Sequence, residues 1–231
     1  MLLQEVRCTD KQFPHEALRS LGYYVKVLGQ KSYNGVAILS KYPLDNNFIE
    51  LEGCITSGQD ARYVESDIII NKINHKVISV YIPNGYEVGS QRFVNKIVFF
   101  HKLRQRLIYL LKYEENIIIG GDFNVAPEMI DVYNPKGCVG KLLFNVEERI
   151  SFRRLLNIGL IDTFREFNTE IQQFSWWDYR AGCWEHNKGM RIDHILVSPS
   201  VADRIFKCGV LDEVRGWSKP SDHAPIYINI K

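Results

Sequence analysis

Short apolar runs, each bounded by turn-forming residues, recur along the chain and predict β-strands. They are rich in valine and isoleucine, and several are apolar throughout, as expected for strands that are buried on both faces. The runs lie at 35–40, 66–70, 76–82, 116–120, 194–198 and 224–230. Leu2 and Leu3, just before Glu5, have the character of the buried end of a further strand. We therefore expect a sheet at the core of the protein.

Two helices are predicted beside these strands. Apolar residues recur every three or four positions from Phe93 to Leu110 and indicate a long amphipathic helix packed on a sheet. A second helix is predicted over 146–157, with Gly159 as the glycine that ends it. No internal repeat, linker or low-complexity tract divides the sequence. We expect an α/β or α+β fold in one domain spanning 1–231, with the helices outside the sheets.

Composition narrows the possible partners. The 231 residues include 29 Lys and Arg against 27 Asp and Glu, so the net charge of +2 gives no strong field for nucleic acid or membrane, and a polyanion would need a local patch. The five cysteines are scattered without a C-x-x-C pair, which argues against a disulfide framework or a zinc knuckle. No long apolar window or signal peptide is present. A soluble, cytoplasmic protein is expected, monomeric by default.

Polar residues follow the predicted strands. Asp122 and Asn124 come directly after an apolar run and two glycines, and residues two apart in an extended segment face the same side. Tyr81 ends another run, where its hydroxyl can donate to a phosphate. Taken alone, each feature is also explained by an Asx turn or by a half-buried aromatic at a turn.

Two further carboxylates and a histidine lie at strand ends. Asp193 begins the run at 194–198, where a salt bridge to Arg191 is the competing interpretation. Asp222 and His223 precede the last run, where a surface turn is the alternative. His223 with Asp193 would form a base-and-orienter or phosphate-contact pair. Hard ligands suited to Mg²⁺ or Mn²⁺ are Glu5, Asp122, Asn124 and Asp222, with His223 as a further candidate. Together they make a metal-assisted phosphoester hydrolase chemically plausible.

Aromatic and basic residues are candidates for substrate contacts. Trp176, Trp177 and Met190 could line a pocket for a flipped-out sugar, although core filling explains each of them equally well. For every basic candidate taken alone, a solvated surface charge is the better interpretation. The candidates for contacts with backbone phosphates are Arg180, Lys188, Arg191, Arg153, Arg154, Arg215 and Lys219.

Several motifs stand in an order that resembles the exonuclease III family of AP endonucleases, within the endonuclease/exonuclease/phosphatase superfamily. These motifs include LLQEVRC at 2–8, VYIPNG at 80–85, GGDFNVAP at 120–127, FSWWDYRAG at 174–182, NKGMRIDHILVS at 187–198 and KPSDHAPI at 219–226. The tryptophan-rich segment followed by NKG-x-RIDHIL looks specific to the DNA-repair branch, whereas the GDFN and SDH elements are shared more widely.

The resemblance implies a four-layered sandwich of two packed mixed sheets flanked by helices, with a site at one rim. It makes Glu5 the principal metal ligand, with Asp222 near the metal. It makes Asp122 the group that activates water or donates a proton at the reacting phosphate. It makes Asn124 the group that orients the water and the transition state. Tyr81 and His223, the latter held by Asp193, would contact the phosphate. The implied activity cleaves duplex DNA 5′ to abasic sites and removes nucleotides or blocking groups from 3′ ends.

One departure from the family is expected to matter. Chains of the family begin with an asparagine-bearing strand and a helix, and no such segment precedes Leu2. We therefore expect a fold that is truncated at its N-terminus, with an unpaired strand edge and a weaker metal site. Three alternatives stay open: a start upstream of Met1, a weak or inactive enzyme, and an inactive fold that binds DNA or a partner. A phosphatase or phosphodiesterase of the same superfamily is a further alternative.

Overall fold

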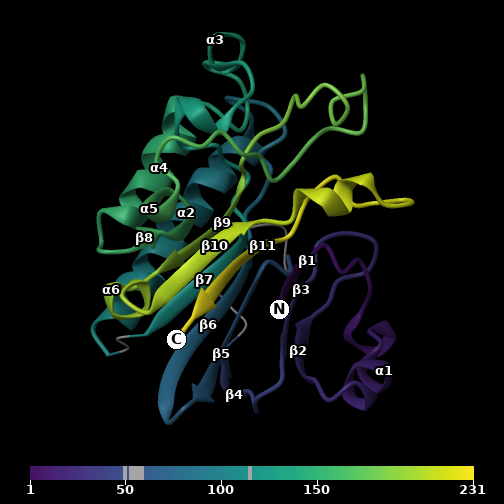
Figure 1. Cartoon of the computed structure of the whole chain (residues 1–231), viewed down its shortest axis with the longest axis vertical. Coiled ribbons are helices and arrows are strands. Elements are labelled where there is room, and N and C mark those ends of the chain that lie inside the picture. Colours follow the sequence, from purple (N-terminus) through teal and green to yellow (C-terminus); the bar gives the residue numbers. More distant parts are fainter. Residues whose placement is uncertain (49–50, 52–59, 114–115) are drawn as a thin grey trace.

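The computed structural model describes residues 1–48, 51, 60–113 and 116–231. Their strands and helices are arranged in layers (Figure 1). The strands are β1 (Leu2–Gln4), β2 (Tyr24–Leu28), β3 (Val36–Ser40), β4 (Asp45–Phe48), β5 (Tyr63–Ile70), β6 (Ile73–Tyr81), β7 (Ile117–Asp122), β8 (Ile161–Asp162), β9 (Asp193–Val197), β10 (Ile205–Val210) and β11 (Ile226–Ile230). The α-helices are α1 (His15–Ser20), α2 (Gln91–Leu111), α3 (Pro135–Cys138), α4 (Val146–Leu156), α5 (Thr163–Phe167) and α6 (Pro199–Ala202).

The larger sheet is mixed and has the strand order β4-β5-β6-β7-β9-β8. Its parallel pair is β6 and β7, which α2 joins by crossing over one face of the sheet. The other pairs along this order are antiparallel. As a result, β6 and β7 end, and β9 begins, on the same side of the sheet. The polar residues Tyr81, Asp122 and Asp193 were predicted at these strand ends.

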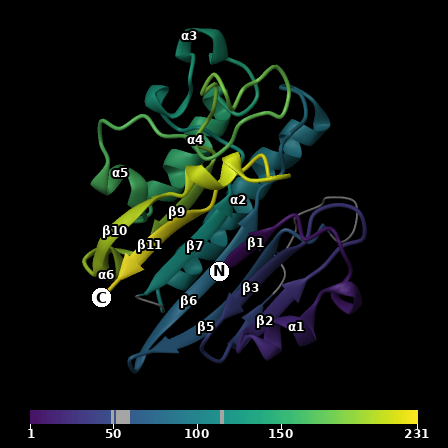
Figure 2. The same ribbon diagram turned by 45° about the vertical axis from the view of Figure 1, so that its right-hand side comes forward.

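Two smaller antiparallel sheets form the neighbouring layer, one with the order β1-β3-β2 and the other pairing β10 with β11 (Figure 2). An apolar cluster around Val36, Ile38 and Val77 joins the first of them to the larger sheet. A second cluster joins β10 and β11 to β9 through Val197, Ile205 and neighbouring residues. Two packed sheets were expected, and the structure confirms the packing, with the second layer divided into two antiparallel pieces.

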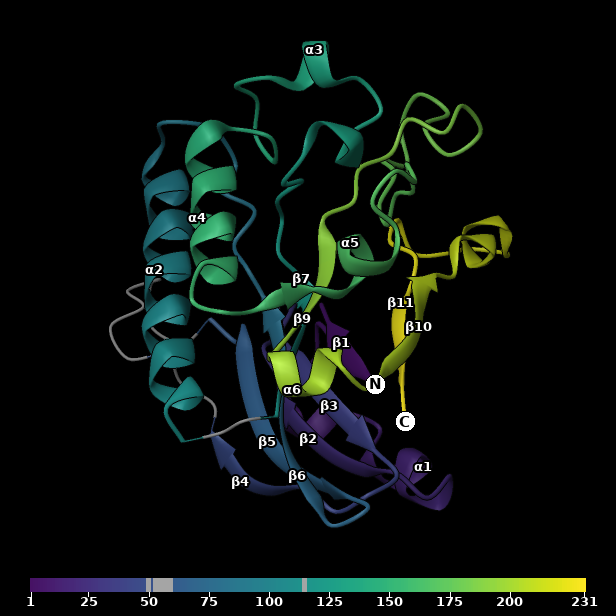
Figure 3. The same cartoon turned by 60° about the vertical axis from the view of Figure 1, so that its left-hand side comes forward.

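Helices cover both outer faces. α2 and α4 lie side by side on the larger sheet (Figure 3), and the apolar face of α2 buries Leu103 and Leu107 completely. Burial of such a side chain stabilises the fold by about 1.5–3 kcal/mol. Apolar residues are therefore favoured on the face of α2 that packs on the sheet, and their spacing of three to four residues predicted this helix. α1 covers the smaller sheet on the opposite side, over a cluster that includes Phe13 and Val27. The order is therefore helix, sheet, sheet, helix, as predicted.

Local signals set the helix ends. Ser90 caps α2 by accepting a hydrogen bond from the Phe93 amide at 3.2 Å. Asn145 and Glu148 form a capping box at the start of α4. α4 ends at Leu156, and Gly159 follows with φ +104°, a left-handed conformation that favours glycine. Within the described ranges, the helices are too short or too polar for any of them to cross a membrane.

Candidate active site

Three predicted site residues stand side by side in one row across the larger sheet. Tyr81 at the end of β6 pairs with Asp122 at the end of β7, and Asp122 pairs with Asp193 at the start of β9. Asp122 and Asp193 are buried and Tyr81 is half-buried. The row joins residues 41 and 71 positions apart, and it exists because β9 runs antiparallel to β7.

A tight turn after β7 shapes the GDFN motif. Gly121 has φ +149°, and a Cβ there would lie 2.0 Å from the Val80 carbonyl oxygen, so only glycine fits. Asn124 has a left-handed φ of +50°. Its backbone amide donates to Asp122 Oδ1 at 2.7 Å and its side-chain amide donates to Asp122 Oδ2 at 2.9 Å. The carboxylate and the amide therefore face the same space, as the i, i+2 spacing predicted.

Asp122 is an electrostatically under-compensated acid. Burial raises its pKa most, and the nearby Asp193 carboxylate raises it further. The charges of His223 and Lys96 and the hydrogen bond from the Asn124 amide oppose this effect, and the pKa settles at about 7. A cation placed near such a carboxyl group would lower its pKa and stabilise the ionised form.

His223 is held as an imidazolium. Its Nδ1 lies 2.9 Å and 3.1 Å from the two carboxylate oxygens of Asp193. The Ser175 hydroxyl also donates to Asp193, at 2.6 Å, which fixes that carboxylate. Burial lowers the pKa of His223, but the Asp193 charge and hydrogen bond outweigh burial and raise the pKa to about 10. The pair predicted from sequence is thus formed.

Glu5 reaches the site from the smaller sheet, one residue after β1, where it has a left-handed φ of +52°. The Tyr81 hydroxyl donates to Glu5 Oε1 at 2.5 Å, and Arg7 forms an ion pair with Oε2. Burial raises the pKa of Glu5, but these two hydrogen bonds outweigh it and leave the pKa below its usual value. Burial and the hydrogen bond to Glu5 raise the pKa of Tyr81, which therefore stays a neutral donor.

The predicted metal ligands do not form a closed cage. Among the described residues, no three His, Cys, Asp or Glu side chains gather closely enough to hold a metal ion together. The Asp222 carboxylate is occupied by the Trp176 indole, which donates to it at 3.0 Å, and His223 is engaged by Asp193. Mg²⁺, however, typically binds one or two carboxylates and keeps several waters. Glu5 and Asp122 supply hard oxygen donors of the kind that such an ion takes, and both carboxylates also accept hydrogen bonds, Glu5 from Tyr81 and Arg7 and Asp122 from Asn124.

The aromatic candidates separate by burial. Trp176 is half-buried and forms isolated bridges with both His223 and Met190, which places it next to the site. Trp177 is only 1% exposed, and its indole donates to Asn187 at 3.1 Å. The interpretation of Trp177 as a direct sugar contact is therefore wrong, because its ring lies in the core with Phe174.

Two of the basic candidates are also internal. Arg191 is 1% exposed and binds Asp131 and Asp162, so it neither contacts a backbone phosphate nor pairs with Asp193. Arg215 is 4% exposed, and its guanidinium donates to the Ser221 carbonyl. Both corrections have the same cause, since a sequence does not distinguish a buried guanidinium with partners from an exposed one.

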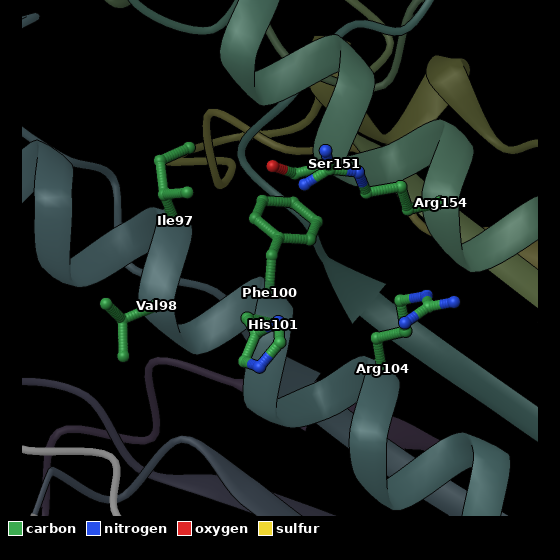
Figure 4. A pocket seen from close by; sticks show the side chains of 7 residues that line it. All are labelled: Ile97, Val98, Phe100, His101, Arg104, Ser151 and Arg154. Atoms are coloured by element: carbon green, nitrogen blue, oxygen red, sulfur yellow. The ribbon is translucent and has the colours of Figure 1, made fainter.

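The other basic candidates lie on the surface. Arg180 is exposed and pairs with Asp178, whereas Lys188 and Lys219 are exposed. Arg153 pairs with Glu128. Arg154 lies away from the row of site residues, where it lines a groove of about 460 Å³ between α2 and α4 (Figure 4). That groove contains none of the predicted catalytic or metal-binding residues.

Sequence reasoning missed several residues that touch the site, including Asn84 and Lys96. The Asn84 side chain donates to Asn124 Oδ1 at 3.0 Å. The ammonium of Lys96 is fully buried and donates to the Asn124 carbonyl oxygen at 2.6 Å. Asn84 was visible only as part of a Pro-Asn-Gly turn. Lys96 carried no sequence signal, because lysine on an amphipathic helix normally faces water.

A layered α/β sandwich with carboxylates, a neutral tyrosine and an imidazolium at one edge has the parts of a phosphoester hydrolase. The family model described as the Endonuclease/Exonuclease/phosphatase family matches residues 1–223, and the chain belongs to this family. It is 37% identical to exodeoxyribonuclease III of Haemophilus influenzae, over 99% of this chain and 88% of that one.

Solved structures agree with this assignment. The 3′ phosphatase NExo from Neisseria, bound to a product DNA hairpin, is similar with a TM-score of 0.95 and 32% identity, over 100% of this chain and 88% of that one. An AP endonuclease from Archaeoglobus fulgidus has a TM-score of 0.88 and 29% identity, over 99% of this chain and 87% of that one. The fold of packed sheets flanked by helices, which the family resemblance implied, matches the fold of these proteins.

Proposed function

We propose that this protein hydrolyses duplex DNA on the 5′ side of abasic sites and removes nucleotides or blocking groups from 3′ ends. It is a hydrolytic nuclease of DNA repair, as its similarity to exodeoxyribonucleases and AP endonucleases over nearly the whole chain supports. The single observation that carries the proposal is the row of Tyr81, Asp122 and Asp193, with His223 and Glu5 joined to it by hydrogen bonds.

Each residue of this row has a role that follows from its charge. Phosphodiester cleavage builds negative charge on the phosphate oxygens, and the His223 imidazolium and the neutral Tyr81 hydroxyl are donors for that charge. Asp122, with a pKa of about 7, is suited to accept a proton from the attacking water. Asn124, fixed by its two hydrogen bonds to Asp122, orients that water. Asp193 keeps the His223 imidazole protonated and fixes its orientation.

Members of this family depend on divalent metal ions. Glu5, with Asp122 and Asn124 beside it, would hold such an ion, and we propose Mg²⁺ or Mn²⁺ because the donors are hard oxygens. The ion would neutralise negative charge on the phosphate when it is bound. Asp222 supports the site through its hydrogen bond with Trp176.

Contacts with the substrate are proposed on the surface beside His223. Trp176 and Met190 are half-buried and bridged to each other, so they can present an apolar wall to an extruded abasic sugar. Arg180, on the tryptophan-rich segment, and Lys188, on the NKG motif that follows it, are exposed and would contact backbone phosphates. Double-stranded DNA is therefore the proposed partner, bound by a monomer.

Incubation of the protein with a duplex that carries one abasic analogue, and with a recessed duplex that carries a 3′ phosphate, tests the proposal. We expect incision 5′ to the analogue and release of the 3′ phosphate in the presence of Mg²⁺, and neither product with EDTA. A folded sample that binds the duplex without cutting either substrate would refute the enzyme and support a DNA-binding module. Cleavage of inositol phosphates or phospholipids without cleavage of DNA would support the superfamily alternative.

A further inference from the structure

A lysine is fully buried beneath the turn that carries Asn124. Lys96 belongs to α2, and its side chain is 0% exposed. Its ammonium donates to the backbone carbonyl of Asn124 at 2.6 Å and to that of Asn84 at 3.1 Å, and it forms an ion pair with Glu148 of α4. Burial lowers the pKa of Lys96, and the Glu148 charge opposes this effect. One amine therefore links two helices to two turns.

The two turns that Lys96 joins are those that shape the site. Asn84 and Asn124 are also joined by their side chains, since Asn84 Nδ2 donates to Asn124 Oδ1 at 3.0 Å. Asn124 has a left-handed backbone conformation, which asparagine tolerates better than most residues, and hydrogen bonds engage its backbone on both sides. Its amide and side chain are bound to Asp122, and its carbonyl is bound to Lys96. Both ends of the residue are thereby fixed.

Glu148 holds the lysine from the other side. Its carboxylate accepts hydrogen bonds from the Leu143 amide at 3.2 Å and from the Asn145 amide at 2.9 Å, and its side chain is 0% exposed. Glu148 is therefore tied to the capping box that starts α4. The ion pair gives the ammonium a fixed position relative to the helix layer.

Stability alone does not explain this arrangement. Two charges lose their hydration when they are buried, and replacing a buried pair by apolar residues of similar volume is often neutral or stabilising. An apolar pair would fill the space between α2 and α4, but it would leave the carbonyl groups of Asn84 and Asn124 without their shared donor. What the charged pair supplies beyond packing is the position of these two turns.

We propose that Lys96 is a positioning residue for the reaction, and that it sets the orientation of Asn124 and Asn84 toward the reacting phosphate by binding both backbone carbonyls. The inference rests on the proposed nuclease function. Lys96 itself touches neither substrate nor reacting atoms. Its loss should therefore lower kcat and leave KM nearly unchanged, because a displacement of about 1 Å at a reacting group costs about 100-fold in rate.

The test compares two double variants that each exchange a buried lysine–carboxylate pair for apolar residues. K96M/E148L removes the proposed positioning pair. K76M/D67L removes the pair between Lys76 and Asp67, which are also largely buried but lie in the middle of β6 and β5, with Lys76 five positions along β6 from Tyr81. Steady-state cleavage of the abasic duplex, duplex affinity and thermal unfolding are measured for both.

We expect kcat of K96M/E148L to fall about 10- to 100-fold, with KM and duplex affinity within about two-fold of wild type. K76M/D67L should keep the wild-type kcat. A folded K96M/E148L protein with wild-type kcat would overturn the inference, and so would equal losses in the two double variants. An inactive wild type would instead refute the nuclease function, so the two failures are distinguishable.

If K96M/E148L does not fold, the single variants K96Q and E148Q distinguish the positioning role of Lys96 from a purely structural one. Each breaks the same ion pair and leaves one buried charge behind, so a purely structural role predicts similar losses of kcat in both. The positioning role predicts a loss at least ten-fold larger in K96Q, since E148Q leaves the ammonium on the two carbonyls. Equal losses would contradict it.

Discussion

Buried aspartates near the β7–β9 strand pair differ in their acid–base behaviour. At the site, burial and the Asp193 charge raise the pKa of Asp122 to about 7. In a second cluster, burial also acts on Asp131 and Asp162, but the charge of Arg191 outweighs it and holds the pKa of both below the usual range. At similar burial, the ionised form is therefore disfavoured for Asp122 and favoured for Asp131 and Asp162.

The difference lies in the partners. Arg191 donates to Asp131 at 2.7 Å and to Asp162 at 2.9 Å, and Arg165 adds a second cation beside Asp131. Forked contacts of this kind satisfy both charge and hydrogen bonding. Asp122 instead receives its hydrogen bonds from the neutral Asn124. The Arg191 cluster is a completed structural element, whereas the site retains a deficit of positive charge that a substrate-bound or metal cation can fill.

The largest expected effect is on activity at Asp122. D122N removes the proton acceptor while it keeps the shape of the side chain, so kcat should fall by about 10³-fold. The free energy of unfolding should change little, because the loss of an under-compensated buried charge offsets the loss of one of the two hydrogen bonds that the carboxylate accepts from Asn124. Abasic-duplex cleavage and urea unfolding measure both quantities, and D203N on an exposed position is the control. A D122N protein that is much less stable than wild type would contradict the comparison.

Arg191 should show the opposite behaviour. R191M leaves two buried aspartates without their shared cation, and we expect a loss of about 3–5 kcal/mol in the free energy of unfolding. R153M is the control, since the pair of Arg153 with Glu128 is half-exposed and should contribute about 0–1 kcal/mol. Urea unfolding at pH 7 compares them. Similar losses in both variants would show that the Arg191 cluster is not what stabilises this side of the sheet.

Acid should weaken the same cluster. Because the folded-state pKa of Asp131 and Asp162 is depressed, their contribution is complete above the unfolded value of about 4 and is lost as pH falls through the folded values. Wild-type protein should lose about 1–3 kcal/mol from this source between pH 5 and pH 2. D162N should show a shallower decline when urea unfolding is repeated across this range. An unchanged slope in D162N would mean that other carboxylates cause the acid sensitivity.

Sequence patterns were sufficient where periodicity and turn chemistry act locally. The spacing from Phe93 to Leu110 identified α2, and the apolar runs identified β3, β5, β6, β7, β9 and β11. Four strands, β2, β4, β8 and β10, were not predicted. β4 consists of Asp45, Asn46, Asn47 and Phe48, and β10 carries the exposed Phe206 and Lys207, so neither contains the uniform apolar run that marks a strand buried on both faces.

The site was predictable only where polar residues follow strands. Asp122, Asn124 and Tyr81 could be placed at strand ends, but their alignment with Asp193 depends on the register of β9, which the sequence does not encode locally. Trp177 and Arg191 were misjudged because their burial is set by the tertiary fold, in which Trp177 packs in the core with Phe174 and Arg191 pairs with Asp131, 60 residues away. Lys96 was overlooked for the same reason, since its burial depends on Glu148 from another helix.

The smallest expected effect concerns the charge deficit itself. If a divalent cation fills it, Mg²⁺ at about ten times its dissociation constant should raise the free energy of unfolding by about 1.4 kcal/mol. Glu5 presents an exposed carboxylate with a depressed pKa, so E5Q should lose most of this gain, whereas E87Q on an exposed loop should keep it. Thermal unfolding with and without Mg²⁺ measures the difference. An equal gain in E5Q and E87Q would mean that the ion binds elsewhere.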